Sequence, residues 1–138
     1  MTDSAPTDTL ATQAGNPAGL DLAEHLIAMA QATYAPDVEW AAPRRELVVR
    51  GREAVVRLLL QEVAAMGNAQ FTPVRRSVTD TQVIDEYTIR FVYAGSGIAR
   101  LDCRAGETVE LERVRILALD GGLIARETCI EQWTPLSG

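Results

Sequence analysis

The most constraining feature of this sequence is a change of hydrophobic period about halfway along the chain. Before that point, apolar side chains recur every three or four residues over 20–34 and 53–66, which is the spacing of amphipathic helices. Beyond it, four segments are rich in Val, Ile, Thr and aromatic residues and are separated by Gly-containing turns: 71–78, 82–93, 108–119 and 123–133. Helices followed by a series of strands predict an α+β fold with an antiparallel meander.

Two local signals support this order of elements. Between the predicted helices, Val38-Glu39-Trp40 has strand composition, and residues 46–50 form a second extended segment that ends at Gly51. Between the last two predicted strands, Asp120-Gly121-Gly122 is a strong hairpin signal. We therefore expect a single domain over 20–135.

The first nineteen residues differ from the rest of the chain. They contain two Asp, no Lys or Arg and no apolar run, so they predict a disordered tail over 1–19 and not a secretory signal. No stretch of the sequence is apolar over the roughly 18 residues that a membrane span needs. We expect no membrane association and a cytoplasmic location.

Charge and cysteine usage exclude several partners. The net charge is −6 and the arginines are scattered, which argues against nucleic acid. Cys103 and Cys129 are the only cysteines, and no CxxC or His–Cys cluster surrounds them. The sequence therefore predicts a reducing compartment, no metal site and no cofactor.

Three segments carry a family resemblance: Tyr-Ala-Pro-Asp-Val-Glu-Trp over 34–40, Val-Arg-Gly-Arg-Glu-Ala-Val over 49–55, and the closing hairpin over 109–133. Together they resemble the nuclear transport factor 2-like superfamily, in particular its SnoaL-like and ketosteroid-isomerase-like branch. The resemblance covers residues 20–135. It implies a cone-shaped, curved, mostly antiparallel sheet with helices on its concave face (a cystatin-like α+β barrel) that encloses a small-molecule pocket.

The resemblance also implies a range of functions, because this scaffold hosts isomerases, cyclases, hydrolases and non-catalytic binders. In the isomerase branch, a catalytic carboxylate stands on the first short strand, where this chain has Trp40, with Glu39 pointing the other way. The position of the proton-donating acid of that branch matches Glu112. The arginine and two aspartates of limonene-epoxide-hydrolase-like members are replaced here by Tyr87, Ile89 and Cys129.

Side chains alternate across a strand, so each predicted strand offers two faces. In 108–119, the resemblance favours as concave the set Glu110, Glu112, Val114 and Ile116, with Leu111, Arg113, Arg115 and Leu117 opposite. In 82–93, the aromatic content points inward the set Asp85, Tyr87, Ile89, Phe91 and Tyr93. In 123–133, the inward set is either Ala125, Glu127, Cys129 and Glu131 or, on periodicity alone, Ile124, Arg126, Thr128 and Ile130.

These faces supply the candidate site. Several carboxylates in one apolar cavity cannot all ionise, so at least one pKa rises and the site gains both an acid and a base. The alternative is that the carboxylates pair with arginines across an exposed sheet face. The candidate catalytic residues are Glu112, Asp85 and His25, the only histidine. The candidate substrate-binding residues are Trp40, Tyr87, Phe91, Glu110, Val114, Glu127 and Cys129.

The predicted function is a cofactor-independent SnoaL-like enzyme that acts by acid–base chemistry on a small apolar molecule, as isomerases, polyketide cyclases and hydrolases do. The alternative is a non-catalytic module of the same fold that binds a hydrophobic ligand or dimerises. We also expect a homodimer through the outer sheet face, because Leu111, Val92 and Ile130 would leave an apolar patch there. The pair Arg44-Arg45 is interpreted as solvated charge.

Overall fold

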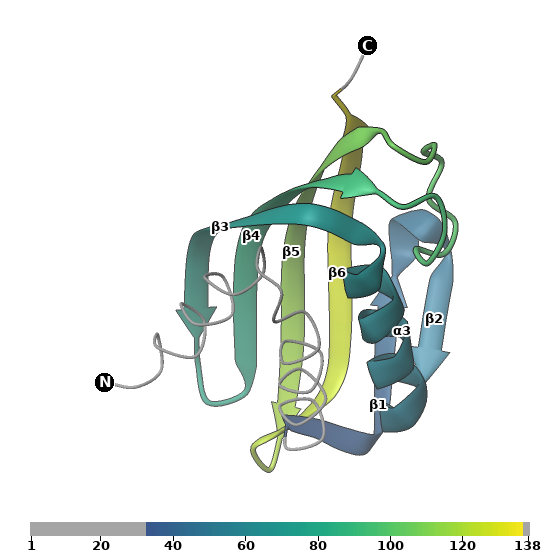
Figure 1. The fold of residues 1–138 in the computed structure, drawn as a ribbon. Helices are drawn as coiled ribbons and strands as arrows, with labels where there is room; N and C mark the ends of the chain where they lie inside the picture. The colour runs from purple at the N-terminus through teal and green to yellow at the C-terminus, as the bar shows by residue number, and fades with distance from the viewer. Residues whose placement is uncertain (1–32, 137–138) are drawn as a thin grey trace.

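The computed structural model describes residues 33–136 (Figure 1). The predicted tail, His25 and nearly all of the predicted helix over 20–34 lie outside these residues. The last residue of that helix, Tyr34, instead begins the first strand, where it lies opposite Ile124. Pro36 follows two positions later and disfavours helix at the residue before it, which keeps this segment extended.

The described residues form one helix, one 3-10 turn and a six-stranded sheet. The elements are β1 (Tyr34–Ala42), η1 (Pro43–Arg45), β2 (Leu47–Arg50), α3 (Arg52–Ala64), β3 (Met66–Val78), β4 (Gln82–Tyr93), β5 (Thr108–Asp120) and β6 (Leu123–Pro135). The strand order is β2-β1-β6-β5-β4-β3, and every neighbouring pair is antiparallel except β1 with β6. The sheet is strongly curved and unclosed, which confirms the predicted α+β cone (Figure 1).

The meander from β3 to β6 follows the predicted strand segments. At the β5–β6 turn, Gly121 and Gly122 adopt φ values of 61° and 84°, which glycine reaches without strain. The difference lies before β3, which begins at Met66 and not at residue 71. The Ala65 amide still donates to the Gln61 carbonyl, as in a helix, and the next residue, Met66, already lies opposite Tyr93 of β4. Strand β3 therefore begins directly where the helix ends.

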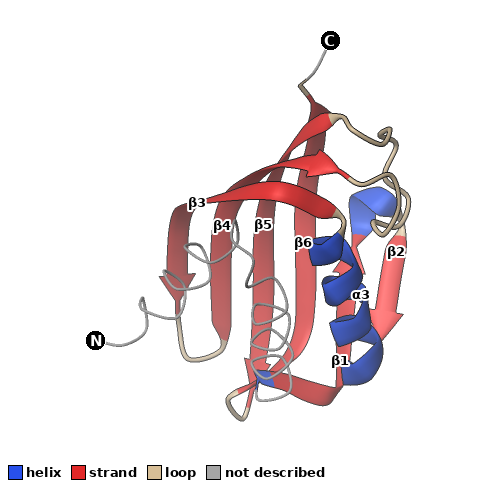
Figure 2. Ribbon diagram, viewed as in Figure 1, coloured by secondary structure: helices blue, strands red, loops and turns tan. Residues whose placement is uncertain are grey.

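Helix α3 lies against the concave face beside β1 (Figure 2). Under it, Val55 packs with the β1 residues Val38 and Trp40, and with Cys129 of β6. A second apolar cluster closes the other end of the sheet and contains Ala65, Phe91, Tyr93, Ile98, Val109 and Leu111. In the part of the chain that the structure describes, no helix is long and apolar enough to cross a membrane.

Candidate functional site

The structure reverses the predicted faces of β5. Val109 and Leu111 have no exposed surface, and Arg113 is 6% exposed, so this alternate set faces the concave side. Glu112 is exposed and Val114 is half-buried on the outer face. The proposed role of Glu112 as a buried proton donor therefore has no basis. The prediction failed because alternation cannot say which of two charged sets is buried; here, ion pairs across the concave face decide.

The other outward residue of β5 that we assigned to the site is Glu110. Its carboxylate forms a surface ion pair with Arg90 of β4 at 3.0 Å. Both Glu110 and Val114 are thus wrongly placed as substrate-binding residues.

The structure agrees with the inward face predicted for β4 and with one of the two alternatives given for β6. Asp85, Tyr87 and Phe91 are on the concave side of β4, with Tyr87 7% and Phe91 1% exposed. On β6, Glu127, Cys129 and Glu131 are buried, whereas Ile130 is 41% exposed. The set that periodicity alone favours, which contains Ile130, therefore does not give the inward face. The remaining substrate-binding candidates on this side are Trp40, Glu127 and Cys129, each at most 1% exposed.

Two arginines and two glutamates form a buried cluster that sequence reasoning missed. This arginine–glutamate cluster consists of Arg45 of η1, Glu62 of α3, Arg113 of β5 and Glu131 of β6, and every side chain is at most 6% exposed. Glu131 accepts from Arg45 Nε at 2.8 Å and from Arg113 Nη2 at 2.7 Å. Glu62 accepts from the same two guanidinium groups at 3.1 and 3.3 Å. The charges of the cluster balance.

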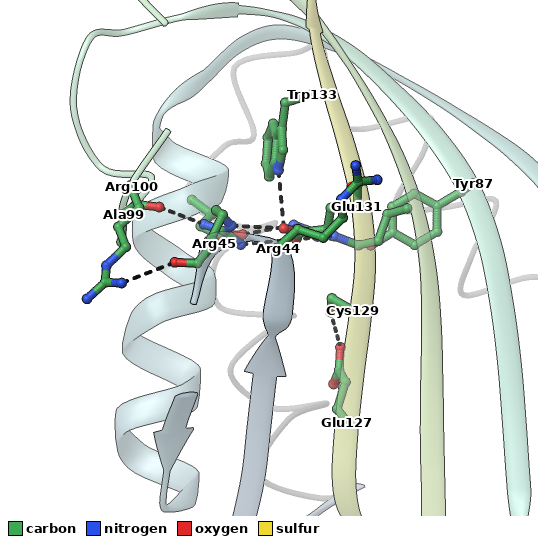
Figure 3. A network of polar contacts seen from close by, with 11 residues as sticks. Arg44, Arg45, Tyr87, Ala99, Arg100, Glu127, Cys129, Glu131 and Trp133 are labelled. Atoms are coloured by element: carbon green, nitrogen blue, oxygen red, sulfur yellow. Dashed lines mark hydrogen bonds and ion pairs between the residues drawn. The ribbon is translucent and has the colours of Figure 1, made fainter. Parts of the chain in front are cut away.

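Aromatic side chains surround this cluster. Trp133 Nε1 donates to Glu131 at 3.1 Å, and the Arg45 guanidinium lies 5.1 Å from the Trp133 ring centre (Figure 3). Arg45 also donates to the Ala99 carbonyl at 3.0 Å. The interpretation of Arg45 as solvated charge is wrong, because these partners bury it to 6% exposure. At the other side, Arg113 Nη1 donates to the Tyr87 hydroxyl at 3.2 Å.

A second group of polar side chains lies further along the same face. Glu127 accepts a bidentate pair from Arg115, with Nε at 2.7 Å, and also accepts from the Tyr34 hydroxyl and from Cys129 Sγ at 3.5 Å. Arg115 Nη1 lies 3.9 Å from Asp85 Oδ2. We call Tyr34, Arg115, Glu127 and Cys129 the Glu127 group, with Asp85 at its edge.

The electrostatics of this group differ from the sequence prediction of a raised carboxylate pKa. Burial alone would raise the pKa of Glu127, but the Arg115 charge and the hydrogen bonds from Arg115 and Tyr34 hold it below its ordinary value. Burial and the Glu127 carboxylate raise the pKa values of Tyr34 and Cys129. Burial raises the pKa of Tyr87 even though Arg113 opposes the shift. Glu127 is thus ionised, and both phenols keep their protons, at neutral pH.

Asp85 is the carboxylate with the most access to solvent among those on this face. Its side chain is 13% exposed, against at most 3% for Glu62, Glu127 and Glu131. Arg76 of β3 donates to it at 3.0 Å, and the Arg76 side chain is itself half-exposed. A partner that reaches into solvent can be displaced by a ligand at lower cost than a buried one.

The described residues contain no group of three or more metal-ligating side chains. A surface hollow of about 470 Å³ lies at the start of α3, beside Arg50, Arg52 and Arg57. An enclosed pocket over Asp85 and Tyr87 stays a prediction. One buried polar atom, Trp40 Nε1, has no hydrogen-bond partner within the described part of the chain.

The curved, unclosed sheet with a helix against its concave face matches the nuclear transport factor 2-like class of folds. Within it, residues 18–127 match the model of the SnoaL-like domain, so the chain belongs to that family. Among curated proteins, no sequence match was found.

Solved structures share the fold at low sequence identity. A candidate polyketide cyclase from Xanthomonas campestris pv. campestris is 21% identical, with a TM-score of 0.62 over 92% of this chain and 87% of that one. A candidate SnoaL-like polyketide cyclase from Jannaschia sp. CCS1 is 11% identical, with a TM-score of 0.63 over 93% and 86%. A steroid delta-isomerase from Pseudomonas aeruginosa is 19% identical, with a TM-score of 0.54 over 83% and 77%.

Proposed function

We propose that this protein is a cofactor-independent enzyme that moves a proton next to a carbonyl group of a small, neutral, mostly apolar molecule. The observation that carries the proposal is the placement of a partly open carboxylate, Asp85, and a buried phenol, Tyr87, two positions apart on the concave side of β4. One can accept a proton and the other can donate a hydrogen bond to the same ligand.

Asp85 is the proposed base. The deeper carboxylates are fully engaged: two guanidinium groups and an indole donate to Glu131, and Arg115, Tyr34 and Cys129 donate to Glu127. Such carboxylates have little lone-pair capacity left for a substrate proton. Asp85 is different, because its close partner Arg76 lies at the open edge of the sheet.

Tyr87 is the proposed donor. Its oxygen already accepts from Arg113, and no described residue accepts its own hydrogen. The raised pKa keeps that hydrogen in place at neutral pH. A ligand oxygen that takes it would face a phenol polarised by a buried guanidinium, which is the arrangement that stabilises developing negative charge on a carbonyl oxygen.

The reaction step follows from these two roles. The C–H bond next to the carbonyl breaks, its proton forms an O–H bond on Asp85, and the electron pair moves into the ligand to leave an enolate oxygen held by Tyr87. Return of the proton from Asp85 to a different carbon gives isomerisation. Attack of the enolate carbon on a second carbonyl gives cyclisation, and the alkoxide that forms takes the proton back from Asp85. The buried charges on this face are already paired with one another, which favours a neutral ligand over an ionic one.

The relatives are consistent with this class of reaction. A steroid delta-isomerase and candidate polyketide cyclases share the fold. Isomerisation of a ketone and aldol-type cyclisation both begin with removal of a proton next to a carbonyl.

Proton exchange in D2O tests the proposal without knowledge of the natural substrate. We expect the wild-type protein to accelerate deuterium uptake next to the carbonyl of at least one neutral ketone in a panel that includes α-tetralone and a steroid ketone, measured by NMR. Asp85→Asn should reduce the rate by about 100-fold or more, and Tyr87→Phe by about 100-fold.

The matched control is Glu86→Gln. Glu86 is the next residue of β4, points to the opposite face and pairs with Arg75 at 3.5 Å, so its substitution should leave exchange unchanged. Circular dichroism checks that each variant is folded. Exchange that survives Asp85→Asn, or that falls equally in Glu86→Gln, would contradict the assignment.

A second function is favoured by one observation, the saturation of the deep carboxylates by arginines. This is the arrangement of a non-catalytic module that binds a hydrophobic ligand through the same face. Tight binding of a ketone without any deuterium uptake would identify this alternative.

We further propose a cytoplasmic location and no nucleic-acid partner. Both cysteines are free thiols, and Cys129 is buried beside the Glu127 carboxylate with its pKa raised. Burial and a raised pKa both disfavour oxidation of Cys129.

A further inference from the structure

Two arginines of β5 face the concave side, and they differ in how many of their nitrogen atoms are bound. In Arg113, all three guanidinium nitrogens are engaged, because Nε and Nη2 donate to Glu131 and Nη1 donates to the Tyr87 hydroxyl. In Arg115, Nε and Nη2 donate to Glu127 at 2.7 and 3.2 Å, but Nη1 donates no hydrogen bond to any described residue. Arg115 therefore keeps one nitrogen with open donors.

The open nitrogen of Arg115 lies beside the proposed base. Arg115 is directly opposite Asp85 of β4, and the distance from Nη1 to Asp85 Oδ2 is 3.9 Å, which is longer than a hydrogen bond. The Arg115 side chain is 25% exposed, against 6% for Arg113. Because solvent reaches Arg115 at this point, a ligand at Asp85 can reach it as well.

The position of this nitrogen is fixed from behind. The two hydrogen bonds from Arg115 to Glu127 form a bidentate contact, which sets the plane of the guanidinium group. Glu127 is held in turn by the Tyr34 hydroxyl and by Cys129 Sγ, and it is only 1% exposed. A donor that is held in place before the ligand arrives loses little conformational entropy on binding. This gives a role to the Glu127 group, which the proposed reaction does not otherwise use.

The charges around the open nitrogen favour a neutral oxygen as its ligand. Glu127 is ionised and pairs with Arg115 at 2.7 Å, so an incoming carboxylate or phosphate would meet an ion pair that is already complete. Asp85, when ionised as the base, would also repel a second anion. A carbonyl or hydroxyl oxygen needs only an N–H donor, which Nη1 supplies.

We propose that Arg115 is a specificity-determining residue, whose Nη1 donates a hydrogen bond to a second, neutral oxygen of the ligand. This inference rests on the proposed function, because it takes Asp85 and Tyr87 as the groups that contact the acidic carbon and the first oxygen. Tyr87 is two positions from Asp85 along β4, whereas Arg115 lies across from Asp85 on β5. The two donors therefore approach from different sides, and the site favours a ligand with two separated oxygen atoms over a simple ketone.

A pair of phenols tests this role by binding alone. α-Naphthol carries one oxygen for Tyr87, and naphthoresorcinol carries a second oxygen on the same ring. Isothermal titration calorimetry at neutral pH should give a Kd for naphthoresorcinol that is lower by about tenfold or more, the effect of one hydrogen bond from a charged donor. Arg115→Lys keeps the charge but loses the planar fork, so this preference should fall to about twofold or less.

A second variant and a control keep the test independent of folding defects. The double variant Arg115→Gln with Glu127→Gln removes both charges of the pair together, so no uncompensated charge stays buried, and it should lose the preference as well. Arg90→Gln is the matched control, because Arg90 pairs with Glu110 on the outer face and its side chain is 56% exposed. This variant should keep the wild-type preference. Circular dichroism checks that each variant is folded.

The outcomes separate this inference from the proposed function. Equal Kd values for the two phenols in the wild-type protein, or a preference that survives in both Arg115 variants, would overturn the role of Arg115. Failure of both phenols to bind at millimolar concentration would overturn it too. A preference that depends on Arg115 in a protein without deuterium uptake would support the inference and contradict the enzyme. Deuterium uptake without the preference would support Asp85 and Tyr87 and remove Arg115.

Discussion

The two faces of β5 carry the same kinds of side chain in opposite environments. On the concave side, Arg113 and Arg115 are held by Glu131 and Glu127 at 2.7 Å each. On the outer side, Glu110 meets Arg90 at a similar distance, 3.0 Å, but the Arg90 side chain is 56% exposed. The distances are nearly the same, so burial and not geometry separates the two sets of ion pairs.

This difference has an energetic consequence. An exposed ion pair contributes about 0.2–1 kcal/mol, because water competes with both partners. A buried pair gains little over an apolar core, yet removal of one partner leaves an uncompensated charge and destabilises the fold by about 3–5 kcal/mol. Substitution of any single residue in the buried ion pairs of the concave face is therefore expected to destabilise the fold.

The largest expected effect is that of Glu131→Gln. This substitution keeps the side-chain volume but leaves Arg45 and Arg113 with only Glu62 as a counter-charge. We expect the free energy of unfolding to fall by about 3–5 kcal/mol in urea titrations followed by circular dichroism. Glu110→Gln on the outer face should lower it by less than about 1 kcal/mol. If both variants lost the same free energy of unfolding, burial would not distinguish the ion pairs of the two faces.

The sequence predicted the order of elements well, because hydrophobic period and turn glycines are local signals. The helix over 53–66, the strand at Val38-Glu39-Trp40 and the four-strand meander all appear near the expected bounds. The inward face of β4 could also be predicted from the sequence, because three aromatic residues, Tyr87, Phe91 and Tyr93, stand at alternate positions. Local pattern was sufficient in each of these cases.

The arginine–glutamate cluster could not be predicted from local sequence patterns. Arg45 comes from a turn, Glu62 from a helix and Glu131 from the last strand, and only tertiary packing brings them together. One signal was present in the closing hairpin: alternate positions carry Arg113 and Arg115 on one strand and Glu127 and Glu131 on the other. Complementary charges on two paired strands indicate a shared face, and this rule would have grouped Arg113 and Arg115 with Glu127 and Glu131. Which side of the sheet this group occupies is decided by tertiary packing.

The second prediction concerns pH. The pKa of Glu127 is lowered by folding, so below its ordinary value of 4.5 the unfolded chain binds more protons than the folded protein. The stabilisation from ionised Glu127 is therefore present in full above pH 4.5 and is lost as the pH falls through the folded-state pKa. We expect the difference in unfolding free energy between wild type and Glu127→Gln to be largest at neutral pH and to shrink on acidification.

Urea titrations of the two proteins between about pH 7 and pH 3 measure this difference. Glu112→Gln is the control, because its carboxylate is exposed on the outer face and its substitution should change the free energy of unfolding only a little. A gap between wild type and Glu127→Gln that is constant with pH would mean that folding does not lower the pKa of Glu127. The bidentate contact with Arg115 would then be much weaker than its 2.7 Å distance indicates.

The smallest expected effect is the coupling between Arg90 and Glu110 on the outer face. A double-mutant cycle with Arg90→Ala and Glu110→Ala isolates their interaction from the other effects of each substitution. Because the Arg90 side chain is 56% exposed and the Glu110 side chain 27% exposed, water screens the pair, and we expect a coupling of about 0.2–1 kcal/mol that declines when salt is added. The same cycle on Arg113 and Glu131, both at most 6% exposed, should give a larger coupling that salt barely changes. If the outer pair matched the inner pair in size and salt response, burial could not be what separates the two faces of β5.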